Sequence, residues 1–156
     1  MLRILAVFTF ACSDPGPATF GDPVENPQLP PRGSLDITTW IAGGDYLEWA
    51  CESAPHAGRA PSPHGLNRIC SNDALIASTG PGPFPVGAAA VKEIYDGERI
   101  SLHAVYRKVA DGEGGATWYW FEGTADDVIA NSEGDGTCVG CHSSAPRDFV
   151  FTPLVE

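Results

Sequence analysis

Three residues near the C-terminus, Cys138, Cys141 and His142, carry the strongest chemical signal in the sequence. With Val139 and Gly140 as spacers they form the pattern C-x-x-C-H, which is the covalent attachment signature of a c-type haem. Two thiols one helical turn apart can both add to the haem vinyl groups, and the adjacent histidine then reaches the iron as its proximal ligand. We therefore expect one covalent haem c per chain, with His142 bound to the iron.

Two other chemistries use a C-x-x-C pair. A structural zinc half-site needs a second Cys/His pair at ligand spacing, and a thioredoxin-like redox pair belongs at a helix start in a βαβ setting. The sequence around Cys138 provides neither context. Haem attachment is thus the interpretation that the motif favours.

The sixth coordination position of the iron has few candidate ligands. The sole methionine is Met1, so a His/Met haem is excluded once the leader is removed. A second axial histidine can come only from His56, His64 or His103. The first two fall in a Pro-rich loop and His103 lies on the polar register of a strand, so we expect all three at the surface. The sequence therefore predicts a five-coordinate haem with an open face.

Residues 1–12 predict export. One positive charge precedes an apolar run that is too short to span a bilayer but suits a signal-peptide core. Cys12 stands where a bacterial lipoprotein carries its lipid, although the preceding box lacks the usual leucine; alternatively it is discarded with the leader. We expect a periplasmic or cell-envelope protein.

A Pro-rich segment, residues 13–33, follows the leader. It holds six prolines and few large apolar residues, a composition that stays extended and cannot build a core. This segment is either a stiff tether or an ordinary disordered tail. The folded haem domain is expected over residues 34–156.

Cys51 and Cys70 are the remaining pair of cysteines. They flank a loop rich in proline, glycine and histidine, and in an oxidising compartment the simplest assignment is a disulfide. Its alternative is two free buried thiols.

The pattern of apolar residues predicts an α+β fold, a small mainly antiparallel β-sheet with flanking short helices. Strands are expected at residues 88–95, 99–109 and 117–122, where apolar or aromatic residues are concentrated or alternate with polar ones. Helical segments are expected from Ser34, over residues 45–50 and 126–130, and around the C-x-x-C-H motif.

Three segments together resemble the cytochrome P-460 and cytochrome c′-beta family. They are Val91-Lys92-Glu93, the aromatic run from Trp118 to Phe121, and the C-x-x-C-H motif with its following residues. The resemblance covers roughly residues 34–153 and implies the same small antiparallel fold. It also implies that Lys92 lies at the haem, bonded to its edge in the P-460 branch and unbonded in the c′-beta branch. A looser match gives Arg68 as a haem-pocket arginine.

Lys92 has an alternative interpretation without a functional role. It can be a lysine at a strand edge whose apolar stem is buried while its ammonium group reaches water.

Two classes of function follow. The first is an oxidoreductase of hydroxylamine or NO that uses Lys92, Arg68 and Glu122, with Glu122 accepting protons from the substrate. Glu93 should point to the other face of its strand. The second is a non-enzymatic protein that binds or senses NO or CO, with a distal wall drawn from aromatic residues that can equally be core: Tyr106, Trp118, Trp120 and Phe121. A bis-His electron-transfer cytochrome is a third alternative.

A net charge of −11 bears on partners. Nucleic acid and anionic lipid would repel such a chain, so we expect neither, and membrane contact only through Cys12. A redox partner protein would present a basic patch. The sequence is also compatible with a homodimer.

Overall fold

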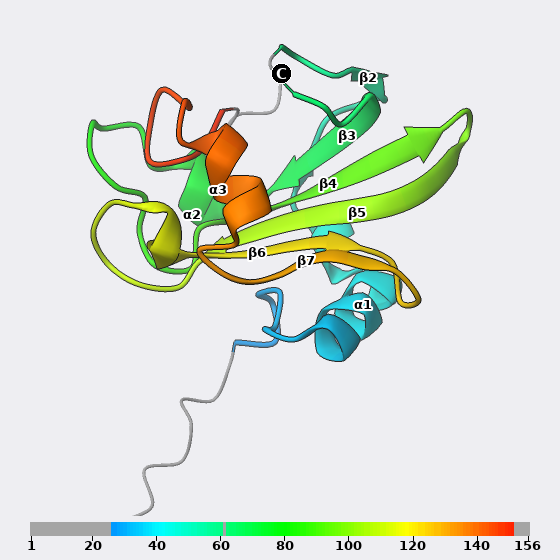
Figure 1. The fold of residues 1–156 in the computed structure, drawn as a ribbon, viewed down its shortest axis with the longest axis horizontal. Coiled ribbons are helices and arrows are strands. Elements are labelled where there is room, and N and C mark those ends of the chain that lie inside the picture. Colours follow the sequence, from blue (N-terminus) through cyan, green and yellow to red (C-terminus); the bar gives the residue numbers. More distant parts are fainter. Residues whose placement is uncertain (1–25, 61, 152–156) are drawn as a thin grey trace, which may run out of the picture.

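One antiparallel sheet forms the centre of the protein (Figure 1). The computed structural model describes residues 26–60 and 62–151. Within them the strands follow the order β1-β3-β4-β5-β6-β7, and the short β2 also pairs with β3. The strands are β1 (Ala50–Cys51), β2 (His56–Ala57), β3 (Leu66–Ser71), β4 (Ala89–Asp96), β5 (Arg99–Lys108), β6 (Trp118–Gly123) and β7 (Val128–Glu133).

Short helices cover both faces of this sheet. The helix α1 (Ser34–Gly43) lies on one face, whereas α2 (Asp73–Ile76) and α3 (Gly136–His142) lie on the other (Figure 1). Two 3-10 turns, η1 (Asp45–Glu48) and η2 (Gly115–Thr117), complete the fold. None of the helices in the described residues is long and apolar enough to cross a membrane.

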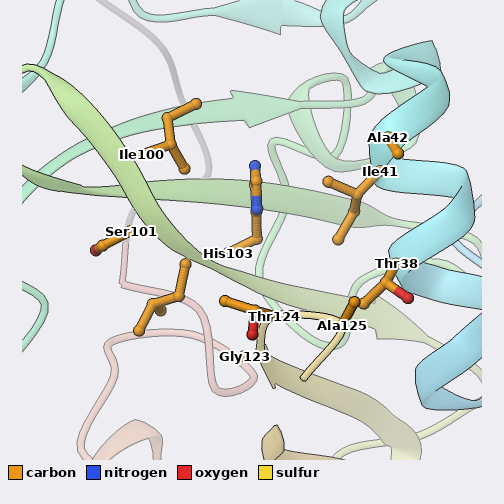
Figure 2. A pocket seen from close by; sticks show the side chains of 10 residues that line it. Thr38, Ile41, Ala42, Ile100, Ser101, His103, Gly123, Thr124 and Ala125 are labelled. Atoms are coloured by element: carbon orange, nitrogen blue, oxygen red, sulfur yellow. The ribbon is translucent and has the colours of Figure 1, made fainter. Parts of the chain in front are cut away.

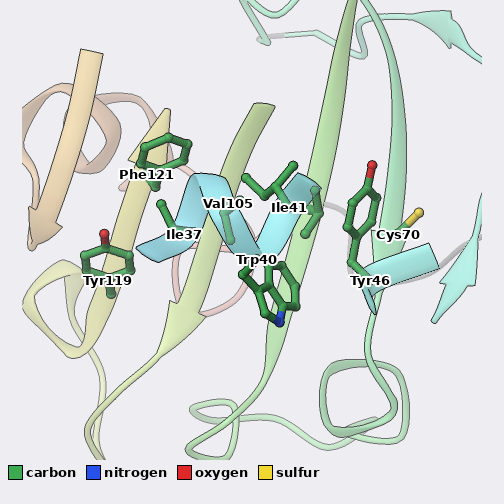
Figure 3. Close-up of a cluster of buried hydrophobic side chains, with 9 residues drawn as sticks. Ile37, Trp40, Ile41, Tyr46, Cys70, Val105, Tyr119 and Phe121 are labelled. Atoms are coloured by element: carbon green, nitrogen blue, oxygen red, sulfur yellow. The ribbon is translucent and has the colours of Figure 1, made fainter. Parts of the chain in front are cut away.

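The α1 face holds one of two hydrophobic clusters. Ile37, Trp40 and Ile41 recur at helical spacing on α1, and all three are buried. Figure 3 shows them packed over β-strand residues that include Val105 and Phe121. The helix ends where Gly44 adopts a left-handed conformation with φ 78° and its N–H bonds Ile41 O, a backbone state that glycine accepts without strain.

The second cluster lies on the opposite face, beneath α2 and α3. Its buried members come from the strands, from α2 and from the loops before β4 and after α3: Ile69, Leu75, Phe84, Ala88, Ala90, Trp118, Trp120 and Val150. Half-buried Cys138, Val139 and Phe149 pack against this cluster. The core is therefore split by the sheet into an α1 side and an α3 side.

The predicted α+β fold with a small antiparallel sheet is confirmed, and the three predicted strands correspond to β4, β5 and β6. The predicted helix over residues 126–130 is wrong. Thr124 Oγ1 accepts the backbone N–H groups of Asp126 and Asp127, which closes a turn, and β7 then pairs with β6. The helical segment expected over residues 45–50 is only the short η1.

The folded part begins before Ser34. Trp40 Nε1 donates to Pro27 O at 3.1 Å, Arg107 Nη1 donates to Pro30 O at 2.8 Å, and Gly33 N donates to Tyr119 Oη at 2.9 Å. These bonds attach residues 27–33 to the domain, so the linker predicted to reach Gly33 ends earlier. The predicted leader and Cys12 lie outside the described residues.

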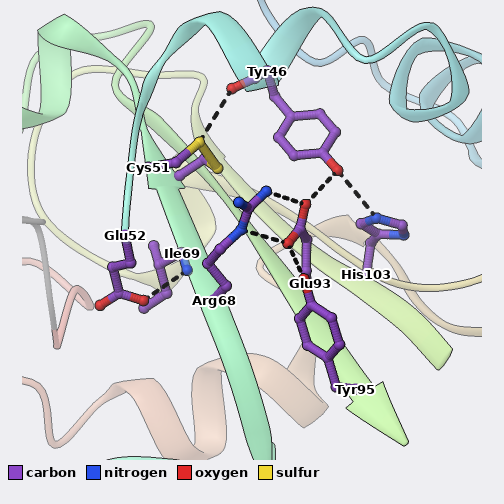
Figure 4. Close-up of a disulfide and its surroundings, with 9 residues drawn as sticks. Tyr46, Cys51, Glu52, Arg68, Ile69, Glu93, Tyr95 and His103 are labelled. Atoms are coloured by element: carbon purple, nitrogen blue, oxygen red, sulfur yellow. Dashed lines mark hydrogen bonds and ion pairs between the residues drawn. A yellow bond between two sulfur atoms is a disulfide. The ribbon is translucent and has the colours of Figure 1, made fainter. Parts of the chain in front are cut away.

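The predicted Cys51–Cys70 disulfide is present (Figure 4). The two cysteines are directly opposed in the β1–β3 pairing, with Cα atoms 3.9 Å apart. The bond therefore closes the loop that leaves β1 and returns through β3.

Replacing both Cys51 and Cys70 by alanine should lower the free energy of unfolding by about 3 kcal/mol, because the cross-link restricts the unfolded chain. Urea unfolding with and without a reductant measures this change. Reductant should destabilise the parent protein by a similar amount and leave the double variant unaffected. Equal stability of the parent protein in both buffers would contradict the prediction.

Candidate haem site

The α3 face of the sheet carries three rows of side chains. Directly paired residues of neighbouring antiparallel strands point to the same face, and every second residue along β5 begins a new row. In order along β5 the rows are Lys108 with Trp118, Tyr106 with Trp120, and Ala104 between Lys92 and Glu122. The face thus changes from a buried aromatic end to a half-exposed end that carries Lys92 and Glu122.

The helix α3 brings the two thiols of the motif to this face. Asp135 caps its N-terminus, with a carboxylate that accepts the Thr137 N–H at 3.0 Å. Cys138 and Cys141 lie one turn apart and neither is in a disulfide; Cys138 is half-buried and Cys141 exposed. Gly115 allows the helix to approach, because a Cβ at that position would lie 2.5 Å from Val139 Cγ2.

His142, the last residue of α3, lies over the middle row. Its ring centroid is 4.7 Å from that of Trp120 and 6.3 Å from that of Tyr106. Nδ1 is 2.7 Å from Phe149 O, and because a carbonyl only accepts, Nδ1 carries the proton. Nε2 is then the nitrogen with a lone pair, as in a histidine prepared to bind a metal. Both thiols and this imidazole fit the requirements of a c-type haem.

Lys92 and Glu122 perturb each other at the half-exposed end of the face. Burial lowers the pKa of Lys92 to about 8, with Arg59 adding to the shift, while Glu122 and Glu52 oppose it. Burial raises the pKa of Glu122, and the positive charge of Lys92 opposes that rise. The two groups therefore share one poorly solvated environment, on either side of the small Ala104.

His64 joins these groups, which contradicts its predicted surface position. Its Nδ1 lies 3.7 Å from Glu122 Oε1. Burial lowers the pKa of His64 to about 4, and the charges of Lys92 and His142 act in the same direction. Lys92, Glu122, His142 and His64 thus lie together on the α3 side, and His64 is the member of this group that the sequence did not predict there.

A buried carboxylate explains why the loop that carries His64 folds back onto the sheet. Glu52 is 5% exposed and accepts the Ile69 N–H, Arg59 Nη2 and His56 Nε2, each at 2.8 Å. It therefore ties the outgoing part of the loop to β3 beside the disulfide. In the sequence, these contacts are indicated only by a glutamate directly after Cys51. The sequence does not reveal which residues bind this glutamate.

Arg68 lies on the face of the sheet opposite to His142, so the structure does not bring it to the candidate site as the resemblance implied. It is paired in register with Glu93, one residue from Lys92, and Nε and Nη2 of Arg68 donate to the Glu93 carboxylate at 2.7 and 2.9 Å. Figure 4 shows Tyr46 and Tyr95 donating to the same carboxylate. Burial tends to raise the pKa of Glu93, but these bonds outweigh it and the net pKa is lowered. The prediction that Glu93 points to the other face of its strand is confirmed.

His103 and Phe121 also belong to the α1 side. His103 Nε2 is 3.5 Å from Tyr46 Oη. Its ring borders a pocket of about 330 Å³ that is lined by α1, β5 and the turn after β6 (Figure 2). Phe121 is part of the α1 cluster. Tyr106, Trp118 and Trp120 are therefore the predicted wall aromatics that face α3.

No family model and no curated protein matches the chain. The resemblance to the cytochrome P-460 and cytochrome c′-beta family remains an inference from the residues that carry it. Of the expected site residues, Lys92, Glu122, Cys138, Cys141 and His142 lie on one side of the sheet, and Arg68 lies on the other.

Glu122→Gln should lower the pKa of Lys92 below about 8. Two negative charges, Glu122 and Glu52, favour the protonated form of Lys92, and Glu122 has the larger effect. Reductive ¹³C-methylation followed by NMR titration measures this pKa, since the sequence has only one other lysine, the buried Lys108. The exposed Glu98→Gln is the matched control and should change nothing. An unchanged or raised pKa in Glu122→Gln would show that the two groups do not interact.

Proposed function

We propose that the chain is an exported mono-haem c-type cytochrome that binds or oxidises small nitrogen species such as hydroxylamine or NO. The observation that carries this proposal is the hydrogen bond from His142 Nδ1 to Phe149 O, because it prepares Nε2 to bind iron on the helix that holds both thiols. Cys138 and Cys141 would hold the haem and His142 would bind its iron. The haem, when bound, would supply the redox-active iron that accepts electrons from a substrate.

Lys92 would act beside the macrocycle. A lysine with a pKa of about 8 carries a neutral amine in a fraction of molecules at neutral pH. That neutral form can accept as well as donate a hydrogen bond at the haem edge, whereas a fully protonated lysine can only donate. The lowered pKa favours the functional interpretation of Lys92 over that of a snorkelling residue.

Glu122 would accept protons from the bound substrate. Its raised pKa makes it a stronger base than an ordinary exposed carboxylate, which suits proton transfer near neutral pH. His64, whose Nδ1 is 3.7 Å from Glu122 Oε1, has a pKa lowered to about 4 by burial, so it stays neutral beside this carboxylate and the proton remains on Glu122. Ala104, which is paired with both Lys92 and Glu122, presents only a methyl group between them.

A bis-His electron-transfer cytochrome is the second candidate, and the position of His64 favours it. Of the three histidines considered as a second axial ligand, His64 shares an environment with His142, while His103 lies on the other side of the sheet. His56 is bound to Glu52. If this candidate is correct, His64 would occupy the iron face that the first proposal leaves for substrate.

Export and a protein partner are also part of the proposal. The Cys51–Cys70 disulfide supports an oxidising compartment such as the periplasm or cell envelope. With a net charge of −11 the chain would be steered toward a redox partner that presents a basic patch.

Covalent attachment can be tested directly. Expressed with a haem-ligation system, the protein should keep its haem through extraction with acidified organic solvent, because both thioether bonds survive denaturation. Cys138→Ser with Cys141→Ser should release any haem that it binds, as a pyridine haemochrome assay of both phases measures. Cys51→Ala with Cys70→Ala, which removes the other two described cysteines, should retain it. Loss of haem from the parent protein would refute the proposal.

The ferric spectrum should distinguish the two candidates. Under the first proposal it is high-spin, changes in Lys92→Ala, and keeps its spin state in both His64→Ala and the control His103→Ala. A low-spin spectrum that becomes high-spin in His64→Ala, but not in His103→Ala, would replace the first proposal by the bis-His one. Hydroxylamine turnover by the high-spin protein, and its loss in Glu122→Gln, would separate an enzyme from a protein that only binds or senses NO.

A further inference from the structure

A buried ion pair joins the sheet to the C-terminal loop. The side chains of Lys108 and Asp148 are 0% and 1% exposed, and Nζ lies 2.7 Å from Oδ2. Nζ also donates to Gly112 O at 2.6 Å and to Thr117 Oγ1 at 2.7 Å, and it lies 4.9 Å from the centroid of Trp118. Each of the three ammonium protons thus has a hydrogen-bond acceptor, so the orientation of the Lys108–Asp148 ion pair is fixed.

The pair holds an unfavourable backbone conformation. Asp148 and Phe149 have φ angles of 38° and 66°, and they are the two non-glycine residues with positive φ among residues 26–60 and 62–151. Residues with a Cβ persist in this region only when their surroundings hold them there. Here Asp148 Oδ2 accepts from both Lys108 and the Phe84 N–H, the latter at 2.9 Å.

The backbone held in this way supplies the partner of His142. The carbonyl of Phe149, directly after Asp148, lies 2.7 Å from His142 Nδ1. On the other side of Asp148, Arg147 Nε donates to Gly82 O at 2.8 Å, which fastens the same loop to a second segment. A continuous series of contacts therefore runs from the sheet through Lys108, Asp148 and Phe149 to the imidazole.

We propose that the Lys108–Asp148 ion pair is the positioning device of His142, because it aims the Phe149 carbonyl at Nδ1 and so fixes the tautomer and the ring orientation. The consequence for iron rests on the proposed function, whereas the tautomer is a property of the chain itself. A hydrogen bond from Nδ1 to a carbonyl makes Nε2 a stronger electron-pair donor to the iron. Stronger donation favours the oxidised iron and so lowers the midpoint potential.

An ion pair suits this task better than an apolar contact. Burying two charges is costly, and apolar residues of similar volume often stabilise a fold equally well. Apolar packing, however, has no preferred direction, so it cannot dictate where the next carbonyl points. Lys108→Met with Asp148→Leu is therefore expected to stay folded while it releases the Phe149 carbonyl.

The test compares this double variant with the parent protein in three readouts. In the full chain without haem, ¹⁵N NMR of the imidazole should change from a single Nδ1–H tautomer of His142 to a mixture. In the haem-loaded protein the midpoint potential should rise and the iron–histidine stretching frequency should fall. Arg32→Met, which removes an exposed ion pair with Glu133, is the matched control and should leave all three quantities unchanged.

A folded double variant with the parent tautomer and the parent potential would overturn the inference. A chain that binds no haem would refute the proposed function alone, because the tautomer still tests the inference. Asp148→Asn keeps the size of the side chain and an acceptor oxygen but removes its charge. It should shift each readout in the same direction by a smaller amount, and it replaces the double variant if that protein does not fold.

Discussion

The register of β4, β5 and β6 is the constraint on which the rest of the site depends. Successive strand residues point to opposite faces, so Lys92 faces α3 and the adjacent Glu93 faces α1. A slip of one residue would exchange them and bring the Glu93 carboxylate to the α3 face, away from Tyr46. Both faces resist such a slip, because each has its own buried cluster and Glu93 is already satisfied by Arg68 from β3.

Buried carboxylates then fasten the segments that have little regular structure. Glu52 holds the loop that ends in His64, and Asp148 holds the loop that ends in Phe149. Each carboxylate accepts hydrogen bonds from a cationic side chain and from a backbone N–H, so each fixes a backbone segment as well as a side chain. A chain of this size has a small core, and directional bonds of this kind position loops that hydrophobic packing would leave loosely specified. The residues around His142 are thus placed by polar contacts at least as much as by apolar ones.

Long-range contacts of this kind also explain which positions could not be predicted from the sequence. The alternation of residues 99–109 and the motif around Cys138 are local patterns, and both predicted the observed elements. Glu122 shares a face with Trp118 and Trp120 for the same reason, because residues two apart in a strand point the same way. His64 and Arg68 were misplaced because their positions depend on pairing with residues distant in the chain, Glu52 holding the loop of the first and β4 setting the face of the second. No pattern within either segment records such a partner.

The two lysines of the chain illustrate the same division. Both lie on the α3 face, in β4 and β5, and composition alone treats them alike. Lys108 has three acceptors around its ammonium group, one of them the Asp148 carboxylate, and it serves as a fixed cation at the buried end of the face. Lys92 lies at the half-exposed end, where burial lowers its pKa to about 8. The number of partners that the fold gives each lysine therefore decides which one is structural and which one is available for chemistry.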